Sequence, residues 1–458
     1  MLLAAGCGAT TRFSEVDPLK PDNNVSKEPT IDSEFLTAEQ WINSLEKKDY
    51  GEYEFTVVTA SEGAFIPVDD GLFQQAINTR NSWVENKFNI RFVTKVIPKD
   101  SYYTEIRNAQ QADTYIGDLL LGPADEMSKL IPEGHLMNLT TLPYFNMNAE
   151  YVNNDFLKNT TGSNTVYMMV DGVSEYIGAQ WCVFYDLELL SKLGLEDPSV
   201  YVKDGSWTWD KLLSMAEEVS KLGEGYTGFS SYVDTSNLLN AIWGSSGVKF
   251  LGDNYKKPLK YGVDLDAAQV NLDTANLVFK SKSYSTAQKS ASLESFKNGK
   301  TLFYIYRLDL ASAIAENKRE WSIVPLPKVT GTQENYYSFV DQSVNAIGVP
   351  YKIENSERTG VILNALFASS YEHIENAVEN SYINFYLRNN SSALMLDKII
   401  DSTSLDFTFL YGGGIVKISN STYELFDEIR LKKLDLAEHF QKKNFISAIE
   451  VDTAEYFK

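Results

Sequence analysis

Two patterns of apolar residues, one alternating and one helical, follow each other where the body of the chain begins. The segment 54–59 alternates and is rich in β-branched residues, which predicts a strand. Apolar residues then recur at helical spacing over 72–88, and a second strand pattern follows at 89–94. A further helical segment at 102–111 leads into the apolar run 116–121. This β-α-β-α-β order predicts a parallel sheet wound by helices, and hence an α/β fold.

The predicted sheet has one edge that favours ligand binding. In open parallel sheets, ligands bind beyond the carboxyl ends of the strands. The loops 61–63 and 122–125 follow two of the predicted strands and therefore lie at that edge. We expect Ser61, Glu62 and Asp125 to face a ligand there.

Length and composition then limit the architecture and the partners. The chain has 458 residues, of which 43% are hydrophobic and 13% aromatic, as in a globular protein. Single cores stop growing at around 250–300 residues, so the body predicts two lobes. The net charge of −21 disfavours nucleic acid and anionic lipid as partners. No later stretch approaches the roughly 18 apolar residues of a membrane helix.

The amino-terminal residues 1–7, Met-Leu-Leu-Ala-Ala-Gly-Cys, resemble a bacterial lipobox. That resemblance implies cleavage before Cys7 and diacylation of its sulfur, because two acyl chains hold a protein firmly at a membrane. Most of a signal peptide is missing ahead of this motif, so we expect the natural start upstream. The polar segment 8–51 predicts a flexible tether. The expected location is the bacterial cell surface, with a lipid anchor in the outer face of the cytoplasmic membrane.

Four later segments carry a resemblance to a known family. They are FYDLELLSKLGL at 184–195, WTWDKLL at 207–213, FKNGKTLFY at 296–304 and WSIVPLP at 321–327. In the second, Thr208 is placed to cap a helix that Gly223 closes. In this order the segments resemble the family 1 extracellular solute-binding proteins of ABC importers, with 338–348 at the position of a ligand loop.

The resemblance implies a two-lobe, periplasmic-binding-protein-like fold of type II. Solute would bind between the lobes, and its contacts with both would stabilise the closed form. The implied partners are an ABC permease and a solute, most often a mono- or oligosaccharide, with the binding protein acting as a monomer. We expect hinge crossings near 178–181, 302–304 and 346–350, a first lobe of 52–178 plus 304–347, and a second lobe of 179–303 plus 348–458.

Residue chemistry selects candidates for the ligand site. A sugar has apolar faces and a rim of hydroxyls, which suit aromatic rings beside carboxylates, amides and arginines. The expected ligand contacts are Ser61, Glu62, Asp125, Gln180, Trp181, Trp243, Tyr306, Arg307, Asp309, Asp341 and Gln342.

Each candidate also has a purely structural interpretation. Trp181 and Trp243 are equally compatible with a core position, as we expect for Trp83, Trp209 and Trp321. Arg307 and Asp309 are spaced to pair with each other across a turn, and Glu62 suits a solvated loop.

Few features of the sequence indicate an enzyme. His135, His373 and His439 lie in unrelated contexts, so we expect no metal and no cofactor. The glycine pattern GEGYTG at 223–228 follows a predicted helix, which favours a helix stop over a dinucleotide site. Two alternatives stay open: a secreted glycoside-active enzyme, because carboxylates are abundant, and a structural or adhesive surface lipoprotein. Saturable binding without turnover would distinguish an importer subunit from both.

Overall fold

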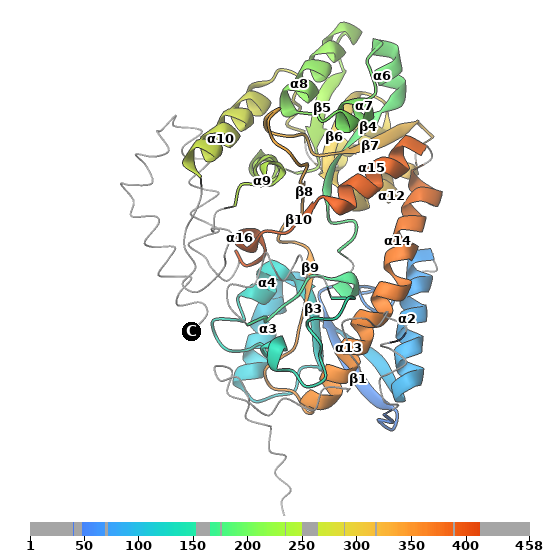
Figure 1. Cartoon of the computed structure of the whole chain (residues 1–458), viewed down its shortest axis with the longest axis vertical. Coiled ribbons are helices and arrows are strands. Elements are labelled where there is room, and N and C mark those ends of the chain that lie inside the picture. Colours follow the sequence, from blue (N-terminus) through green and yellow to red (C-terminus); the bar gives the residue numbers. More distant parts are fainter. Residues whose placement is uncertain are drawn as a thin grey trace, which may run out of the picture.

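The computed structural model describes residues 40, 48–68, 72–152, 165–174, 176–233, 235–249, 264–287, 289–316, 318–387 and 390–412. The chain forms two lobes, and each is built on a four-stranded sheet with helices packed around it (Figure 1). Within these residues no helix is long and apolar enough to cross a membrane.

The first sheet confirms the predicted β-α-β-α-β unit. Its strand order is β2-β1-β3-β9, and β1 pairs in parallel with both β2 and β3. Every residue of β3 is buried, as expected for an inner strand covered on both faces. The bounds are β1 Tyr53–Thr59, α2 Leu72–Phe88, β2 Ile90–Val96, α3 Lys99–Gln111, β3 Leu119–Pro123 and the antiparallel β9 Asn345–Gly348.

The second sheet has the order β5-β6-β4-β7, with β4 antiparallel to both of its neighbours. Its strands are β4 Trp181–Asp186, β5 Thr227–Ser231, β6 Thr301–Arg307 and β7 Trp321–Pro325. The helices of this lobe are α6 Leu187–Leu193, α7 Pro198–Lys203, α8 Trp209–Glu218, α9 Thr235–Ser246, α10 Leu265–Lys280, α11 Lys289–Lys297, α12 Ala311–Ala315 and α15 Asn390–Asp401.

The predicted cap of α8 is confirmed. The Thr208 hydroxyl accepts the backbone N–H of Lys211 at 3.2 Å, which satisfies one of the free donors at the helix start. The short turn η4 (Val219–Leu222) follows α8, and Gly223 ends it with φ +90°. Only glycine adopts this backbone conformation without strain, so the glycine stops the helix.

Strand pairing places some segments in a different lobe from the one expected. Residues 302–304 lie in the middle of β6, between β4 and β5, so the chain does not cross between lobes there. β7 also belongs to the second sheet, although 304–347 was assigned to the first lobe. Helix α13 (Ser356–His373) packs against α2, although 348–458 was assigned to the second lobe. The lobe to which a strand or helix belongs depends on contacts between residues far apart in the sequence, and local motifs do not specify those contacts.

Four described segments connect the lobes, the fourth being residues 405–406. The first, 176–180, enters the second sheet at β4, and the second, 340–344, joins β8 (Ser338–Phe339) to β9 in the first sheet. The third is α14 (Glu375–Ser381), which contacts α2, together with the π-helical turn η6 (Tyr382–Tyr386), which contacts α12 (Figure 1). The expected crossing at 346–350 is wrong, because β9 pairs with β3 and Pro350 bridges to Leu136, both in the first lobe.

Shorter elements complete the described fold. The strand β10 (Thr403–Ser404) pairs with β8, and α16 (Phe407–Leu410) then contacts α4 (Ala124–Ser128) of the first lobe. Single helical turns are η2 (Leu139–Thr141), η3 (Gly172–Ser174) and η5 (Leu308–Leu310).

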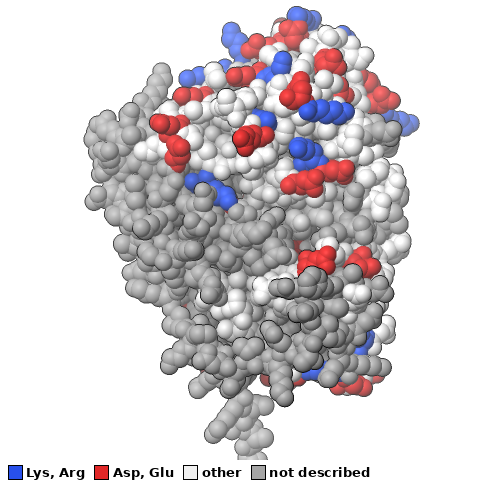
Figure 2. Space-filling model, in the orientation of Figure 1, with Lys and Arg blue, Asp and Glu red and all other residues white. Residues whose placement is uncertain are grey.

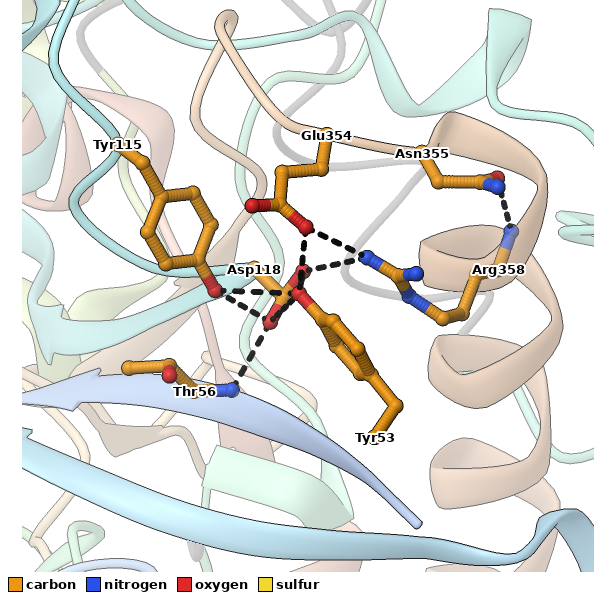
Figure 3. Close-up of polar contacts among 7 residues, drawn as sticks. All are labelled: Tyr53, Thr56, Tyr115, Asp118, Glu354, Asn355 and Arg358. Atoms are coloured by element: carbon orange, nitrogen blue, oxygen red, sulfur yellow. Dashed lines mark hydrogen bonds and ion pairs between the residues drawn. The ribbon is translucent and has the colours of Figure 1, made fainter. Parts of the chain in front are cut away.

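A buried carboxylate links β1 to α13 in the first lobe (Figure 3). Asp118 accepts hydrogen bonds from the Thr56 backbone N–H at 2.9 Å and from the Tyr115 hydroxyl at 2.6 Å. Arg358 of α13 lies 3.6 Å from Asp118 and 3.4 Å from the ring centroid of Tyr53. Burial raises the pKa of Asp118, and the hydrogen bonds and Arg358 offset this only in part. The network therefore holds the helix against the start of the sheet.

The last residues of the predicted tether contact the first lobe. The Tyr50 backbone N–H donates to the Phe88 carbonyl at 3.0 Å, and Lys48 pairs with Glu357 of α13. Residues 1–39 and 41–47, including Cys7, lie outside the described residues, as do 413–458. On the face drawn in Figure 2, Lys and Arg are interspersed with Asp and Glu over the second lobe.

Candidate functional site

The carboxyl ends of parallel strands in both sheets lead to one loop, 341–344. In the first sheet, Pro123 at the end of β3 pairs with Asn345, which directly follows this loop. In the second sheet, Arg307 at the end of β6 pairs with Trp181 at the start of β4. The strand ends at which α/β sheets bind ligands therefore meet around the loop.

The first lobe holds the loop through its backbone. The N–H groups of Ala124 and Asp125 donate to the carbonyls of Val344 at 2.9 Å and Gln342 at 3.2 Å. The Asp125 carboxylate lies 3.4 Å from the Lys99 ammonium. Burial raises the pKa of Asp125, and attraction to Lys99 opposes that effect. Asp125 and Gln342, both predicted ligand contacts, are thus brought together.

The second lobe holds the same loop through side chains. The Trp181 indole N–H donates to Asp341 at 2.9 Å, and the Ser343 backbone N–H donates to the same carboxylate at 2.8 Å. Arg307 donates to the Ser343 hydroxyl at 2.8 Å. The loop is therefore bound by both lobes at once.

Arg307 and Asp309 form an ion pair at 2.7 Å, as the structural interpretation of this pair anticipated. Burial lowers the pKa of Arg307, but attraction to Asp309 and Asp341 outweighs it and gives a net rise. Burial raises the pKa of Asp309, and Arg307 opposes that rise. With two carboxylates beside one guanidinium, this cluster carries no excess positive charge.

Aromatic rings surround the cluster on the side of the second sheet. Trp181 is only 1% exposed and lies between Tyr306 at 5.2 Å and Phe339 at 6.1 Å, measured between ring centroids. Its indole is therefore part of the core in this arrangement. Tyr232 and Tyr306 are half-buried, and their ring centroids are 4.8 Å apart. This tyrosine pair offers a partly accessible aromatic surface at the end of β6.

Gln180 fixes the first connection between the lobes. Its side-chain carbonyl accepts the Gly178 backbone N–H at 2.8 Å, and its amide donates to the Thr403 hydroxyl at 3.1 Å. Because Gln180 is fully buried, its side chain positions the backbone.

The other three predicted ligand contacts are Ser61, Glu62 and Trp243. Ser61 and Glu62 are exposed in the loop after β1, as the solvated interpretation of Glu62 anticipated. Trp243 of α9 is 2% exposed, and its indole N–H donates to the Val248 carbonyl at 2.9 Å. Trp209 and Trp321 are buried as expected, whereas Trp83 is only half-buried.

The structure adds residues that the sequence reasoning missed. Ser343 and Phe339 lie within the predicted ligand loop 338–348, so both could have been predicted from the position of that loop. Tyr232 directly follows β5, where the strand-end rule also applies. Thr403 comes from the carboxyl-terminal part, where no motif indicated a role. Among the described residues, no group of three or more His, Cys, Asp or Glu is placed to hold a metal ion.

Comparison with solved structures identifies proteins of similar fold. The galacto-N-biose/lacto-N-biose I-binding protein of a Bifidobacterium longum ABC transporter, solved with lacto-N-biose, aligns with TM-score 0.58 and 14% identity. That alignment covers 90% of this chain and 99% of the other. A cyclic α-maltosyl-1,6-maltose binding protein from Arthrobacter globiformis aligns with TM-score 0.56 and 13% identity, covering 89% and 100%. At these identities the likeness concerns the fold alone.

Sequence comparison is more specific about the family. No curated protein matches this chain. The model of the bacterial extracellular solute-binding protein family matches residues 68–368, well over half of the 458 residues. This match includes most of both sheets and the loop 341–344. The chain belongs to the bacterial extracellular solute-binding protein family.

Proposed function

We propose that this protein is the substrate-binding lipoprotein of an ABC importer, which captures a mono- or oligosaccharide between its lobes and delivers it to a membrane permease. One observation carries the proposal: both lobes bind a single loop, 341–344, the first through backbone N–H groups and the second through the side chains of Trp181 and Arg307. A solute bound there contacts both lobes and thereby stabilises their closed arrangement. Structural neighbours solved with sugars, including lacto-N-biose and α-D-tagatose, support a carbohydrate as the solute.

The side chains at the loop suit a neutral ligand that is rich in hydroxyls. Asp309 and Asp341 balance the charge of Arg307, so an anion gains little there. Among the described residues, the Arg307 Nε and the Gln342 side-chain oxygen are buried without a hydrogen-bond partner. Sugar hydroxyls both donate and accept, and can satisfy both groups. The Tyr232 and Tyr306 rings offer a surface for the apolar face of a sugar ring.

A bound carbohydrate should stabilise the fold, because ligand that binds only the folded state shifts the unfolding equilibrium. The expected gain is about 2.7 kcal/mol at a ligand concentration 100 times Kd. Thermal-shift measurement over a panel of mono- and oligosaccharides, followed by calorimetry on the hits, tests this. No shift with any sugar would contradict a carbohydrate ligand, and release of products during incubation would indicate the glycosidase alternative.

Matched tyrosine variants locate the site in that same assay. Tyr232→Ala should weaken sugar binding by about 1–3 kcal/mol, the scale of a lost aromatic contact. Tyr226 lies just before the opposite end of β5, so Tyr226→Ala serves as the control and should leave affinity unchanged. Equal affinities for the two variants would place the ligand elsewhere.

The proposed anchor is tested separately at Cys7. With an upstream signal peptide supplied, Cys7→Ala should move the protein from the membrane fraction to the medium, because the acylated sulfur is lost. Cell fractionation with immunoblotting measures the shift. A variant that stays as firmly membrane-bound as the wild type would contradict the lipobox interpretation.

A further inference from the structure

The end of β6 and the two residues after it, 307–309, contact the first two of the segments that connect the lobes. The Asp309 backbone N–H donates to the Gly178 carbonyl at 2.8 Å in the first segment. Arg307 binds Ser343 in the second. Tyr382 of the third segment lies against Gly178 of the first, because a Cβ added to this glycine would be 2.8 Å from the Tyr382 hydroxyl. Residues 307–309 therefore join two of the connections directly, and the third lies against the first.

Arg307 is the residue whose side chain spans this junction. One terminal nitrogen pairs with Asp309 at 2.7 Å, within the second lobe. The other terminal nitrogen donates to the Ser343 hydroxyl, in a loop whose backbone is bound to Ala124 and Asp125 of the first lobe. The planar guanidinium makes both contacts at once because its donors have a fixed fork geometry. Asp309 thus orients the Arg307 guanidinium, which links the second lobe to the loop held by the first.

We infer that the Arg307–Ser343 hydrogen bond is a hinge lock, which stabilises the present arrangement of the two lobes and opens when a ligand takes its place. Among the described residues, the bond is one of two side-chain links from the sheet of the second lobe to a loop held by the first, the other joining Trp181 to Asp341. Arg307 is also within the group of residues proposed to meet the solute. A ligand oxygen that accepts from Arg307 competes with the Ser343 hydroxyl and weakens the hold of the second lobe on the loop 341–344. This second step rests on the proposed function, whereas the lock itself does not.

The lock is tested by the distance between the lobes in protein without added ligand. Spin labels at Thr104→Cys in α3 and Leu277→Cys in α10 report it, because both positions are exposed and Cys182 is buried. Cys7 is replaced by Ala in this background. Ser343→Ala should broaden or shift the distance distribution relative to the unsubstituted protein. Arg307→Lys should do the same, because a lysine ammonium lacks the fork that reaches Asp309 and Ser343 together.

Ser312→Ala is the matched control. Ser312 also donates to this junction, at 3.1 Å to the Asp309 carbonyl, but it does so within the second lobe. Its removal should leave the distance distribution unchanged. A distribution for Ser343→Ala that coincides with those of the unsubstituted protein and Ser312→Ala would overturn the lock, provided that circular dichroism shows all the proteins folded.

The competition step is tested with a sugar identified by the thermal-shift panel. Ser343→Ala should bind it more tightly, by roughly fivefold or more, because the sugar no longer displaces the serine hydroxyl. Unchanged or weaker binding would overturn the competition. Absence of any binding sugar would count against the proposed carbohydrate ligand, and the distance measurement would still decide whether the lock exists.

Discussion

Trp181→Ala should lower the free energy of unfolding by about 3–5 kcal/mol, the range for truncating a buried aromatic side chain. The ring is 1% exposed, packs between Tyr306 and Phe339, and donates to Asp341. Its removal leaves a cavity at the start of β4 and takes a donor from the Asp341 carboxylate. Urea unfolding followed by circular dichroism measures the change.

Two further variants identify the cause of the loss. The first separates the effect of the cavity from that of the lost hydrogen bond, and the second compares a less buried tryptophan. Trp181→Phe keeps most of the ring contacts but lacks the indole N–H, so its loss should be only about 1–3 kcal/mol. Trp83→Ala removes a half-buried tryptophan from α2 and should cost less than Trp181→Ala. If Trp181→Ala instead cost no more than Trp83→Ala and mainly weakened sugar binding, Trp181 would be a ligand platform and not a core residue.

The β1, β2 and β3 strands of the first sheet and the helices between them were predicted because their signals are local, whereas β9 was not predicted. The alternation in β1 and the helical spacing in α2 are complete within each segment. The lobe to which a strand belongs was harder to predict. β6 and β7 belong to the second lobe only because they pair with β4, and this pairing is not visible in their own sequences. Helix α13 is buried on nearly all sides from Thr359 to Ser370, so its pattern does not indicate its partner.

The candidate site was predictable to the extent that strand ends define it. Asp125 follows a predicted strand, and strand ends of α/β sheets converge at one edge. Asp341 lies in the loop 338–348, which the family resemblance placed at the ligand. The roles of Trp181 and Trp243 were not predictable, because the same apolar ring serves a core and a sugar platform equally well. The role of Thr403 could not be predicted, because its hydrogen bond with Gln180 joins residues more than 200 positions apart in the sequence.

Arg358→Met should also destabilise the protein by about 3–5 kcal/mol, because it leaves the buried Asp118 carboxylate without its cation. Methionine keeps an unbranched apolar chain over the Tyr53 ring, so most of the packing is preserved. Arg107→Met is the matched control, since Arg107 pairs with Glu133 at 3.0 Å near the surface. Loss of such a pair should cost within about 1 kcal/mol.

The pH dependence of this loss identifies its cause. Burial raises the folded-state pKa of Asp118 above its ordinary value of 3.8, and removing Arg358 raises it further. The folded variant then holds the Asp118 proton more tightly than the unfolded chain, so its stability falls as pH rises from the unfolded pKa through the folded one. The deficit of Arg358→Met relative to the wild type should therefore be largest near pH 7 and shrink toward pH 4. Urea unfolding at a series of pH values measures it. A deficit that is independent of pH, or no larger than that of Arg107→Met, would mean that Arg358 stabilises α13 through packing and not through the charge of Asp118.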